Sequence, residues 1–260
     1  SATEPCVLDL GLMDPNQLQP GVISPASGQA TFGYVIEAID ACLAQSVHAV
    51  VTCPANKEAL QSAGVPHPGH TEIFAERTQT EKFCMAFLSD KINCSLVTVH
   101  AGYEQVPGLL NERRIAEVIE LTRETHKKLL GKEPRIAVCG LNPHAGENGM
   151  FGNREEERII QPAIDAMRAE GCDIVGPLPP DTAFTEAQRR QTDAYVCMYH
   201  DQGLIPVKAI AFESAVNVTL GLPIVRTSVD HGTAFDIAWQ GKADSRSLES
   251  AVRLASRLAI

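Results

Sequence analysis

The sequence predicts an α/β protein of three layers, α/β/α, with two domains on either side of a cleft. Short apolar runs of strand length alternate with amphipathic helical stretches along the chain. Several of these runs end in polar, ionisable residues, which is how an open α/β sheet builds a site at the carboxyl ends of its strands. One pair of runs, 83–88 and 92–99, predicts an antiparallel hairpin within this alternating pattern.

Apolar spacing and turn residues predict the elements in order. Residues 1–27 indicate a strand fragment followed by a Pro/Gly-rich loop. The expected helices span 31–43, a short stretch ending near Gly64, 72–77, 109–130, 153–169, 234–240 and 245–259. The expected strands, besides the hairpin, span 48–52, 135–141, 173–175, 194–199, 216–220 and 224–228. Thr71 is expected to cap the helix after it, and His126 to lie on a solvated, charged helix face.

Composition narrows the class of protein. The 260 residues are 44% hydrophobic, enough to form a core in one or two domains. With 22 basic and 32 acidic residues the net charge is −10, which argues against nucleic-acid binding but not against a small anionic substrate. No apolar run approaches the roughly 20 residues needed to cross a bilayer, so no membrane partner is expected. The eight cysteines form no CxxC pair, and we expect reduced, mostly buried thiols in a cytoplasmic protein.

Three apolar runs each deliver a histidine. The runs 94–99, 135–141 and 194–199 are followed by His100, His144 and His200, respectively. Imidazoles suit zinc and other divalent transition metals, and three protein ligands leave coordination positions open for substrate and water. Each histidine alone is more often structural, and their long separations in sequence cannot prove that they meet. We interpret the three together as a predicted metal site.

Other polar residues lie at strand ends or in apolar surroundings. Lys57 follows a strand end, where a solvated lysine and a site residue are both open. Arg226 lies in an apolar strand, and a buried arginine is costly without an anion or a carboxylate partner. An internal ion pair is the alternative to a site role for Arg226. The loop before Thr71 leads into a helix start, which is a ready anion site, and Asp181 is a candidate site carboxylate.

Six motifs give the chain a specific resemblance. PGHTE (68–72), GLNPHAGENG (140–149), GPLPPDT (176–182), MYHDQG (198–203), VNVTLGLP (216–223) and RTSVDHGTA (226–234) occur in this order. Together they resemble the PdxA family, 4-hydroxythreonine-4-phosphate dehydrogenase of pyridoxal phosphate biosynthesis and its paralogues that act on 4-phospho-threonate and 4-phospho-erythronate. That family is similar to isocitrate and isopropylmalate dehydrogenases, and the resemblance implies their fold.

The resemblance implies roles for particular residues. His100, His144 and His200 match the metal ligands, one of which is supplied across the interface of a homodimer. The positions that match substrate-binding residues are His70, Thr71, Lys208, Asn217 and Arg226. The segment His231 to Ala238 has the shape of the relatives' cofactor loop, so His231, Gly232 and Asp236 are expected to bind NAD, with NADP as the alternative. Lys208 and Asp181 are the expected catalytic residues. The cofactor-side domain would comprise 1–60 and 229–260, and the metal, substrate and dimerisation domain would comprise 61–228.

The implied reaction is a metal-dependent oxidation, with zinc, magnesium, manganese or cobalt as the metal. NAD would oxidise the C3 hydroxyl of a 4-phosphorylated 3-hydroxy acid, most simply 4-phosphooxy-L-threonine, and the β-keto acid would then lose carbon dioxide. A 4-phospho-D-threonate or erythronate substrate is the first alternative. A metal-dependent hydrolase or lyase, and an inactive phosphate-binding fragment, are the others.

Three departures from the family pattern bear on these expectations. The family's N-terminal GDPAGIGPE-type segment is absent from this sequence. Cys53 stands where the family has a small Gly or Ala. The residues after His100, Ala-Gly-Tyr-Glu-Gln, differ from the family's Leu-Pro-Leu-Arg, which bears on the identity of the substrate.

Overall fold

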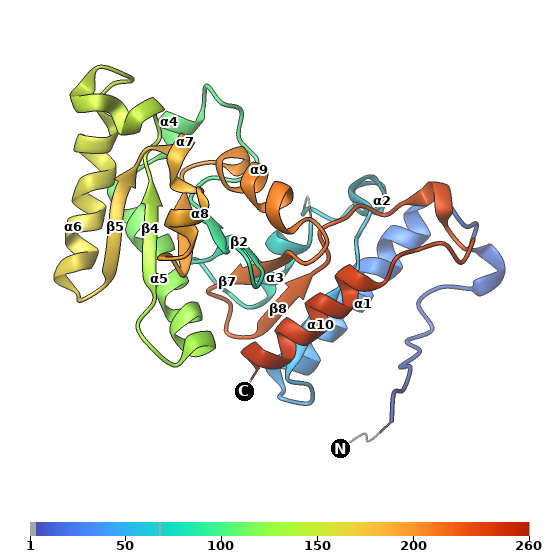
Figure 1. Cartoon of the computed structure of the whole chain (residues 1–260). Helices are drawn as coiled ribbons and strands as arrows, with labels where there is room; N and C mark the ends of the chain where they lie inside the picture. The colour runs from blue at the N-terminus through green and yellow to red at the C-terminus, as the bar shows by residue number, and fades with distance from the viewer. Residues whose placement is uncertain (1–3, 68, 260) are drawn as a thin grey trace.

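The computed structural model describes residues 4–67 and 69–259, and these residues form the predicted α/β/α layers (Figure 1). One mixed sheet has the strand order β1-β8-β7-β2-β3-β6-β4-β5. The strands are β1 (Ala49–Thr52), β2 (Cys84–Leu88), β3 (Cys94–Leu96), β4 (Arg135–Cys139), β5 (Asp173–Leu178), β6 (Ala194–Cys197), β7 (Val216–Leu220) and β8 (Val225–Ser228).

Helices cover both faces of this sheet. One face carries α5 (Glu112–Leu130), α6 (Gln161–Ala169) and α10 (Arg246–Leu258). The other carries α1 (Pro25–Leu43), α3 (His70–Arg77) and α9 (His200–Ala211). Figure 1 shows α6 at one end of the molecule and α1 at the other. The short helices are η1 (Pro15–Gln17), α2 (Lys57–Ser62), α4 (Val106–Leu109), η2 (Pro143–Gly149), η3 (Glu156–Ile160), α7 (Pro180–Ala183), α8 (Glu186–Arg189) and η4 (Phe235–Ile237).

Strand directions decide where polar side chains gather. The strands β3, β6, β4 and β5 run parallel to one another, whereas β2 is antiparallel to both β3 and β7. The predicted hairpin is thereby confirmed, with Ala86 opposite Ser95. Because β3, β4 and β6 point the same way, the segments that carry the three histidines leave the sheet at one edge, as predicted.

The core explains why these segments adopt their structures. Every residue of β6 is buried, as expected for a central strand covered on both faces. The apolar stripe of α5, with Ile115, Val118 and Ile119, is fully buried against the sheet. This helix ends at Gly131, whose φ of 67° is left-handed and suits glycine. Six of the eight cysteines are buried and all eight are free thiols, which confirms the prediction of unpaired, mostly buried thiols.

Several local predictions were wrong. His126 is only 2% exposed, because it sits on the buried side of α5, where its ring meets the backbone of the preceding turn. Thr71 does not cap a helix, since α3 begins at His70, two residues before the expected start, and Gly69 occupies the N-cap position. The expected helix at 234–240 is only the single 3-10 turn η4. Within the described part of residues 1–27, no strand forms.

The main unpredicted helix is α9. The motif after β6 was expected only to break the strand, yet the chain turns into helix at His200 and stays helical past Pro206. No helix in the described ranges is both long and apolar enough to span a membrane. The sheet runs without a break through both predicted domains, and the proposed boundaries stay a prediction.

Candidate active site

A cavity of about 180 Å³ brings four of the five predicted substrate-binding residues together. It lies between α3, the β7–β8 pair and the end of β3. Its lining residues are Ala55, Lys57, Gly69, His70, Thr71, Glu72, Met85, His100, Asn217 and Arg226. The sequence predicted His70, Thr71, Asn217 and Arg226 for one site, and the fold places all four around one cavity. Lys57 joins them, which favours the site role over a solvated lysine.

Arg226 is the main cationic group of this cavity, and it is 4% exposed. Its guanidinium donates hydrogen bonds to Asn217 Oδ1 at 3.3 Å, Thr219 Oγ1 at 3.1 Å and Thr52 Oγ1 at 2.8 Å. It also lies 5.6 Å from the centre of the Phe74 ring.

No carboxylate in the described residues forms an ion pair with this group, and its Nε has no hydrogen-bond partner there. Burial lowers the pKa of Arg226 to about 10, opposed by the nearby Glu72, so the group stays charged at neutral pH. The internal ion pair considered as the alternative for Arg226 is therefore absent from the described chain. A buried cation of this kind calls for an anionic ligand.

The N-terminus of α3 faces the same space. Gly69 is the N-cap residue and has no side chain that could satisfy the first N–H groups of the helix. His70 and Thr71 form the first turn, next to Arg226. Burial, helped by the charge of Arg226, lowers the pKa of His70 to about 4. His70 is therefore neutral at neutral pH and can donate an N–H to an anion without adding charge.

His100 lines this cavity, and His200 lies beside His100. Their ring centroids are 6.1 Å apart. Burial lowers the pKa of His100, as do the charges of Lys57 and His200. A neutral imidazole is the form that binds a metal.

A carboxylate holds the ring of His200. Its Nδ1–H donates to Asp201 Oδ1 at 2.7 Å, and the Tyr103 hydroxyl donates to Asp201 Oδ2 at 2.6 Å. These contacts, first that with Tyr103, lower the pKa of Asp201. Because Nδ1 carries the proton that Asp201 accepts, Nε2 of His200 carries the free lone pair. This is the arrangement found around metal-binding histidines.

His144 has the same arrangement in a different place. Its Nδ1–H donates to Glu147 Oε2 at 2.9 Å, and this bond raises the pKa of His144. The side chain is 60% exposed. Asp181 lies in α7, which contacts η2, and its charge adds to the rise in the pKa of His144. Both sit at the surface of the chain and do not line the cavity that contains Arg226.

A buried carboxylate fixes the loop that carries His144. Residues 144–148 all have left-handed φ values, from 41° to 79°. Glu156 Oε1 accepts hydrogen bonds from the backbone N–H groups of Leu141 at 2.9 Å and Asn142 at 2.7 Å. Glu156 is 3% exposed, and Gly146 packs directly against it, where a Cβ would come within 2.5 Å of Oε2.

The three histidines do not meet within one chain: the described residues contain no group of three His, Cys, Asp or Glu side chains placed to hold a metal ion. The donors nevertheless fit a metal, because two of the imidazoles have Nδ1 bound to a carboxylate and Nε2 free.

The two predicted catalytic residues lie outside the cavity. Lys208 follows His200 along α9, and its ammonium is 3.0 Å from Asp230 Oδ2. Asp181 lies in α7, on the side of His144.

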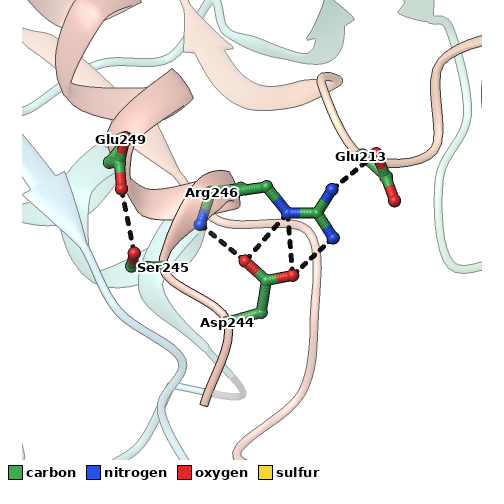
Figure 2. A network of polar contacts seen from close by, with 5 residues as sticks. All are labelled: Glu213, Asp244, Ser245, Arg246 and Glu249. Atoms are coloured by element: carbon green, nitrogen blue, oxygen red, sulfur yellow. Dashed lines mark hydrogen bonds and ion pairs between the residues drawn. The ribbon is translucent and has the colours of Figure 1, made fainter.

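The predicted cofactor loop lines a separate cavity of about 310 Å³. His231 contributes to its wall, together with Asp230, Asp244 and Glu213. Asp236 does not line it, and its backbone carbonyl accepts a hydrogen bond from Gln240 Nε2. Figure 2 shows the guanidinium of Arg246 held between Asp244 and Glu213, with N–O distances of 2.6 Å and 2.8 Å. Arg246 lowers the pKa of Asp244 to about 2.

Sequence reasoning missed the residues that support the histidines. Asp201 directly follows His200, and Glu147 lies three residues after His144. Such spacing is the signal that could have identified them. Tyr103, Thr219 and Thr52 gave no signal, because only the fold brings them to Asp201 and Arg226.

Relatives over most of this chain are dehydrogenases. The 4-hydroxythreonine-4-phosphate dehydrogenase of Desulfosudis oleivorans is 52% identical over 237 residues, which cover 90% of this chain and 70% of the relative. The D-threonate 4-phosphate dehydrogenase of Pectobacterium atrosepticum is 45% identical over 253 residues, which cover 97% and 77%. A crystal structure of 4-hydroxythreonine-4-phosphate dehydrogenase from Klebsiella pneumoniae matches with a TM-score of 0.88 and 46% identity, over 95% of this chain and 75% of that one.

The fold and these relatives define an oxidoreductase of the dehydrogenase class. Within that class the chain belongs to the PdxA family: the family model described as pyridoxal phosphate biosynthetic protein PdxA matches residues 2–255. A dehydrogenase of this family implies a nicotinamide cofactor, and the hydrolase and lyase alternatives are set aside.

Proposed function

We propose that this chain oxidises the C3 hydroxyl of a small 4-phosphorylated hydroxy acid, with a nicotinamide cofactor and a divalent metal. The observation that carries the proposal is the buried guanidinium of Arg226, which forms no ion pair in the described chain, although Glu72 lines the same cavity, and which faces a helix N-terminus across that cavity. A phosphoryl group fits this place, because it accepts several hydrogen bonds and neutralises the cation.

The metal site belongs to two chains in this proposal. His100 and His200 come from one chain, and His144 of a second copy supplies the third imidazole. Its 60% exposed side chain, its distance from the other pair and its engaged Nδ1 all favour this assignment. Asp181 would arrive with it, since it lies beside His144. The homodimer is thus part of the active site.

In the proposed reaction, different residues bind the phosphoryl group and stabilise the developing charge. Arg226, Asn217, His70 and the first turn of α3 hold the phosphoryl group and fix the distance to the three histidines. A bound divalent metal acidifies the hydroxyl that is to be oxidised. Lys208 adds positive charge on the α9 side, where it stabilises negative charge that develops as carbon dioxide leaves.

The choice of cofactor follows from the cavity around His231. Three carboxylates, Asp230, Glu213 and Asp244, line it, and two of them, Glu213 and Asp244, form ion pairs with Arg246, the arginine among its described lining residues. Carboxylates suit the free 2′-hydroxyl of NAD and repel the 2′-phosphate of NADP. We therefore propose NAD over NADP.

Two phosphorylated acids are candidates for the substrate of this site. The relatives named above act on 4-hydroxythreonine 4-phosphate and on D-threonate 4-phosphate. We propose 4-phosphooxy-L-threonine as the substrate, with the threonate phosphate as the second candidate. The residues after His100 differ from the family pattern, and Tyr103 of that segment reaches the carboxylate that orients His200. We therefore keep both phosphorylated acids as candidate substrates.

The test is NADH formation from each phosphorylated acid with the metal-loaded protein. Turnover with one of the two phosphates, and loss of turnover on removal of the metal by a chelator, is the expected result. Equal turnover with the unphosphorylated acids would contradict the phosphate assignment. Absence of NADH formation with every phosphorylated acid would contradict the proposed reaction.

A further inference from the structure

A second cavity, of about 510 Å³, lies at the opposite edge of the sheet from the histidines. It opens where β3, β6 and β7 begin, between α5, α10 and the β2–β3 turn. Its lining includes Lys91, His126, Arg189, Arg253 and Arg257. None of these residues takes part in the proposed reaction, and the cavity shares no lining residue with the two cavities described above.

The charge of this cavity is opposite to that of the whole chain. Four basic side chains line it, Lys91, Arg189, Arg253 and Arg257, against two acidic ones, Asp90 and Asp193. The difference of four and two is a charge of +2, in a chain whose net charge is −10.

The acidic side chains neutralise little of this charge. Asp90 has a 97% exposed side chain and lies 3.8 Å from Arg257, and exposed pairs of this kind are weak. Asp193 accepts the backbone N–H of Arg135. Arg253 has no carboxylate partner among the described residues.

The cavity wall also contains buried polar groups that lack partners. His126 Nδ1–H donates to the carbonyl of Thr122 at 2.8 Å, so Nε2 carries the free lone pair. Burial lowers the pKa of His126, which keeps the ring neutral. Within the described chain, His126 Nε2 has no hydrogen-bond partner, and the buried hydroxyls of Thr192 and Tyr195 have none besides each other. A buried acceptor left unpaired costs free energy, which a ligand that brings a donor recovers.

We propose that this cavity is a second ligand site, for a small organic phosphate that also carries hydroxyl groups. Arg253 and Arg257, one turn apart on α10, bind the phosphate. A ligand hydroxyl donates to His126 Nε2, and the Tyr195 and Thr192 hydroxyls bind other ligand oxygens. The site is separate from the proposed active site, and the proposal does not depend on the reaction catalysed there.

The test uses protein labelled with ¹⁵N in its histidines, in which His126 reports on this cavity alone. Its resonance is assigned by comparison with His126→Gln. Glycerol 3-phosphate is the probe, at constant ionic strength, and Arg226→Met serves as the background so that the other phosphate-sized cavity does not compete. We expect a saturable shift of the His126 Nε2 resonance. In the double variant Arg253→Gln, Arg257→Gln the apparent Kd should rise at least about tenfold.

Two comparisons make the result decisive. Arg113→Gln removes an exposed arginine of α5 that does not line the cavity, and should leave the Kd unchanged. Sulfate has the charge but no hydroxyl donor, and should bind more weakly without moving the Nε2 resonance. An unmoved His126 resonance with glycerol 3-phosphate would overturn the proposal. An equal shift in the double arginine variant would also overturn the proposal.

Discussion

Arg226 is the residue at which sequence and structure bear most directly on function. The sequence identified it from one fact, an arginine in an apolar strand, and left open whether an acid inside the protein pairs with it. In the structure, the guanidinium of Arg226 donates hydrogen bonds to three neutral side-chain oxygens, and no carboxylate of the described chain forms an ion pair with it. Burying such a cation without an ion-pair partner lowers the free energy of unfolding, and a bound anion supplies the missing partner.

Replacing Arg226 with methionine tests this cost. The variant should bind the phosphorylated substrate about 30-fold more weakly, because a hydrogen-bonded charge is lost. In the absence of anion its free energy of unfolding should not fall, since a buried unpaired charge has been removed. Steady-state KM and denaturant unfolding give the two numbers. Arg123→Met is the matched control, because Arg123 pairs with Glu133 away from the site: it should leave KM unchanged. An unchanged KM in the Arg226 variant would refute the anion role.

His70 provides a test by pH. Its pKa is about 4 in the free protein, below the ordinary value near 6.5, because of burial and Arg226. The unfolded chain therefore takes up this proton first as pH falls, and His70 should make the fold less stable as pH drops from about 6.5 to about 4. Phosphate bound beside it favours the imidazolium and should raise the pKa. An NMR titration of His70 with and without phosphate measures the pKa of His70 in the two states, with the exposed His48 as internal control. Titration of His70 near 6.5 without phosphate would contradict the buried setting.

Asp244 tests the choice of cofactor. Asp244→Ser removes one carboxylate that faces the proposed ribose site and releases Arg246 from its main partner. The ratio of kcat/KM for NADP to that for NAD should rise about tenfold, as expected when a 2′-phosphate gains a free arginine. Asp173→Ser, an exposed change outside the cavity, is the control. An unchanged ratio would remove Asp244 from cofactor selection.

At the scale of elements, the sequence predicted the ends of strands better than the conformation of the segments after them. Apolar runs located β4 and β6 because burial on both faces leaves a continuous hydrophobic signal. The η2 loop gave no comparable signal. Its left-handed backbone depends on Glu156, a buried acid twelve residues after His144, whose contacts form only when the chain folds back. The burial of His126 was missed because its neighbours in sequence are charged, whereas its place on α5 faces inward.

Glu156→Ala should therefore weaken the proposed metal site, although Glu156 itself is not one of the proposed ligands. The variant leaves the N–H groups of Leu141 and Asn142 unpaired, which should cost about 1–3 kcal/mol of stability. With His144 no longer fixed, affinity for Co²⁺ should fall about 10-fold or more. Calorimetric metal titration and denaturant unfolding are the measurements. Glu157→Ala is the control, because Glu157 is a partly exposed neighbour that pairs with Arg154. Unchanged metal affinity with reduced stability would show that η2 holds its shape without Glu156.

At the scale of the whole molecule, the three histidines predicted as metal ligands do not come together within the described part of one chain. Strand order brings the carboxyl ends of β3, β4 and β6 to one edge, which is why the sequence could foresee three histidines at one edge of a sheet. The family resemblance implied that one of the three comes from a second copy, but the sequence could not foresee that His100 and His200 lie together while His144 faces outward. The division of a site between two copies depends on surface shape, for which a single sequence has no periodic signal.

Mixing two inactive variants tests the shared site most directly. His144→Ala and His200→Ala chains should each form inactive dimers. After unfolding and refolding together, about half of the dimers are mixed, and each mixed dimer has one complete set of His100, His200 and the second chain's His144. The account predicts recovery of about a quarter of wild-type NADH formation in the mixture. No recovery, in a mixture shown to contain mixed dimers, would mean that each chain supplies its own three ligands and would contradict the account.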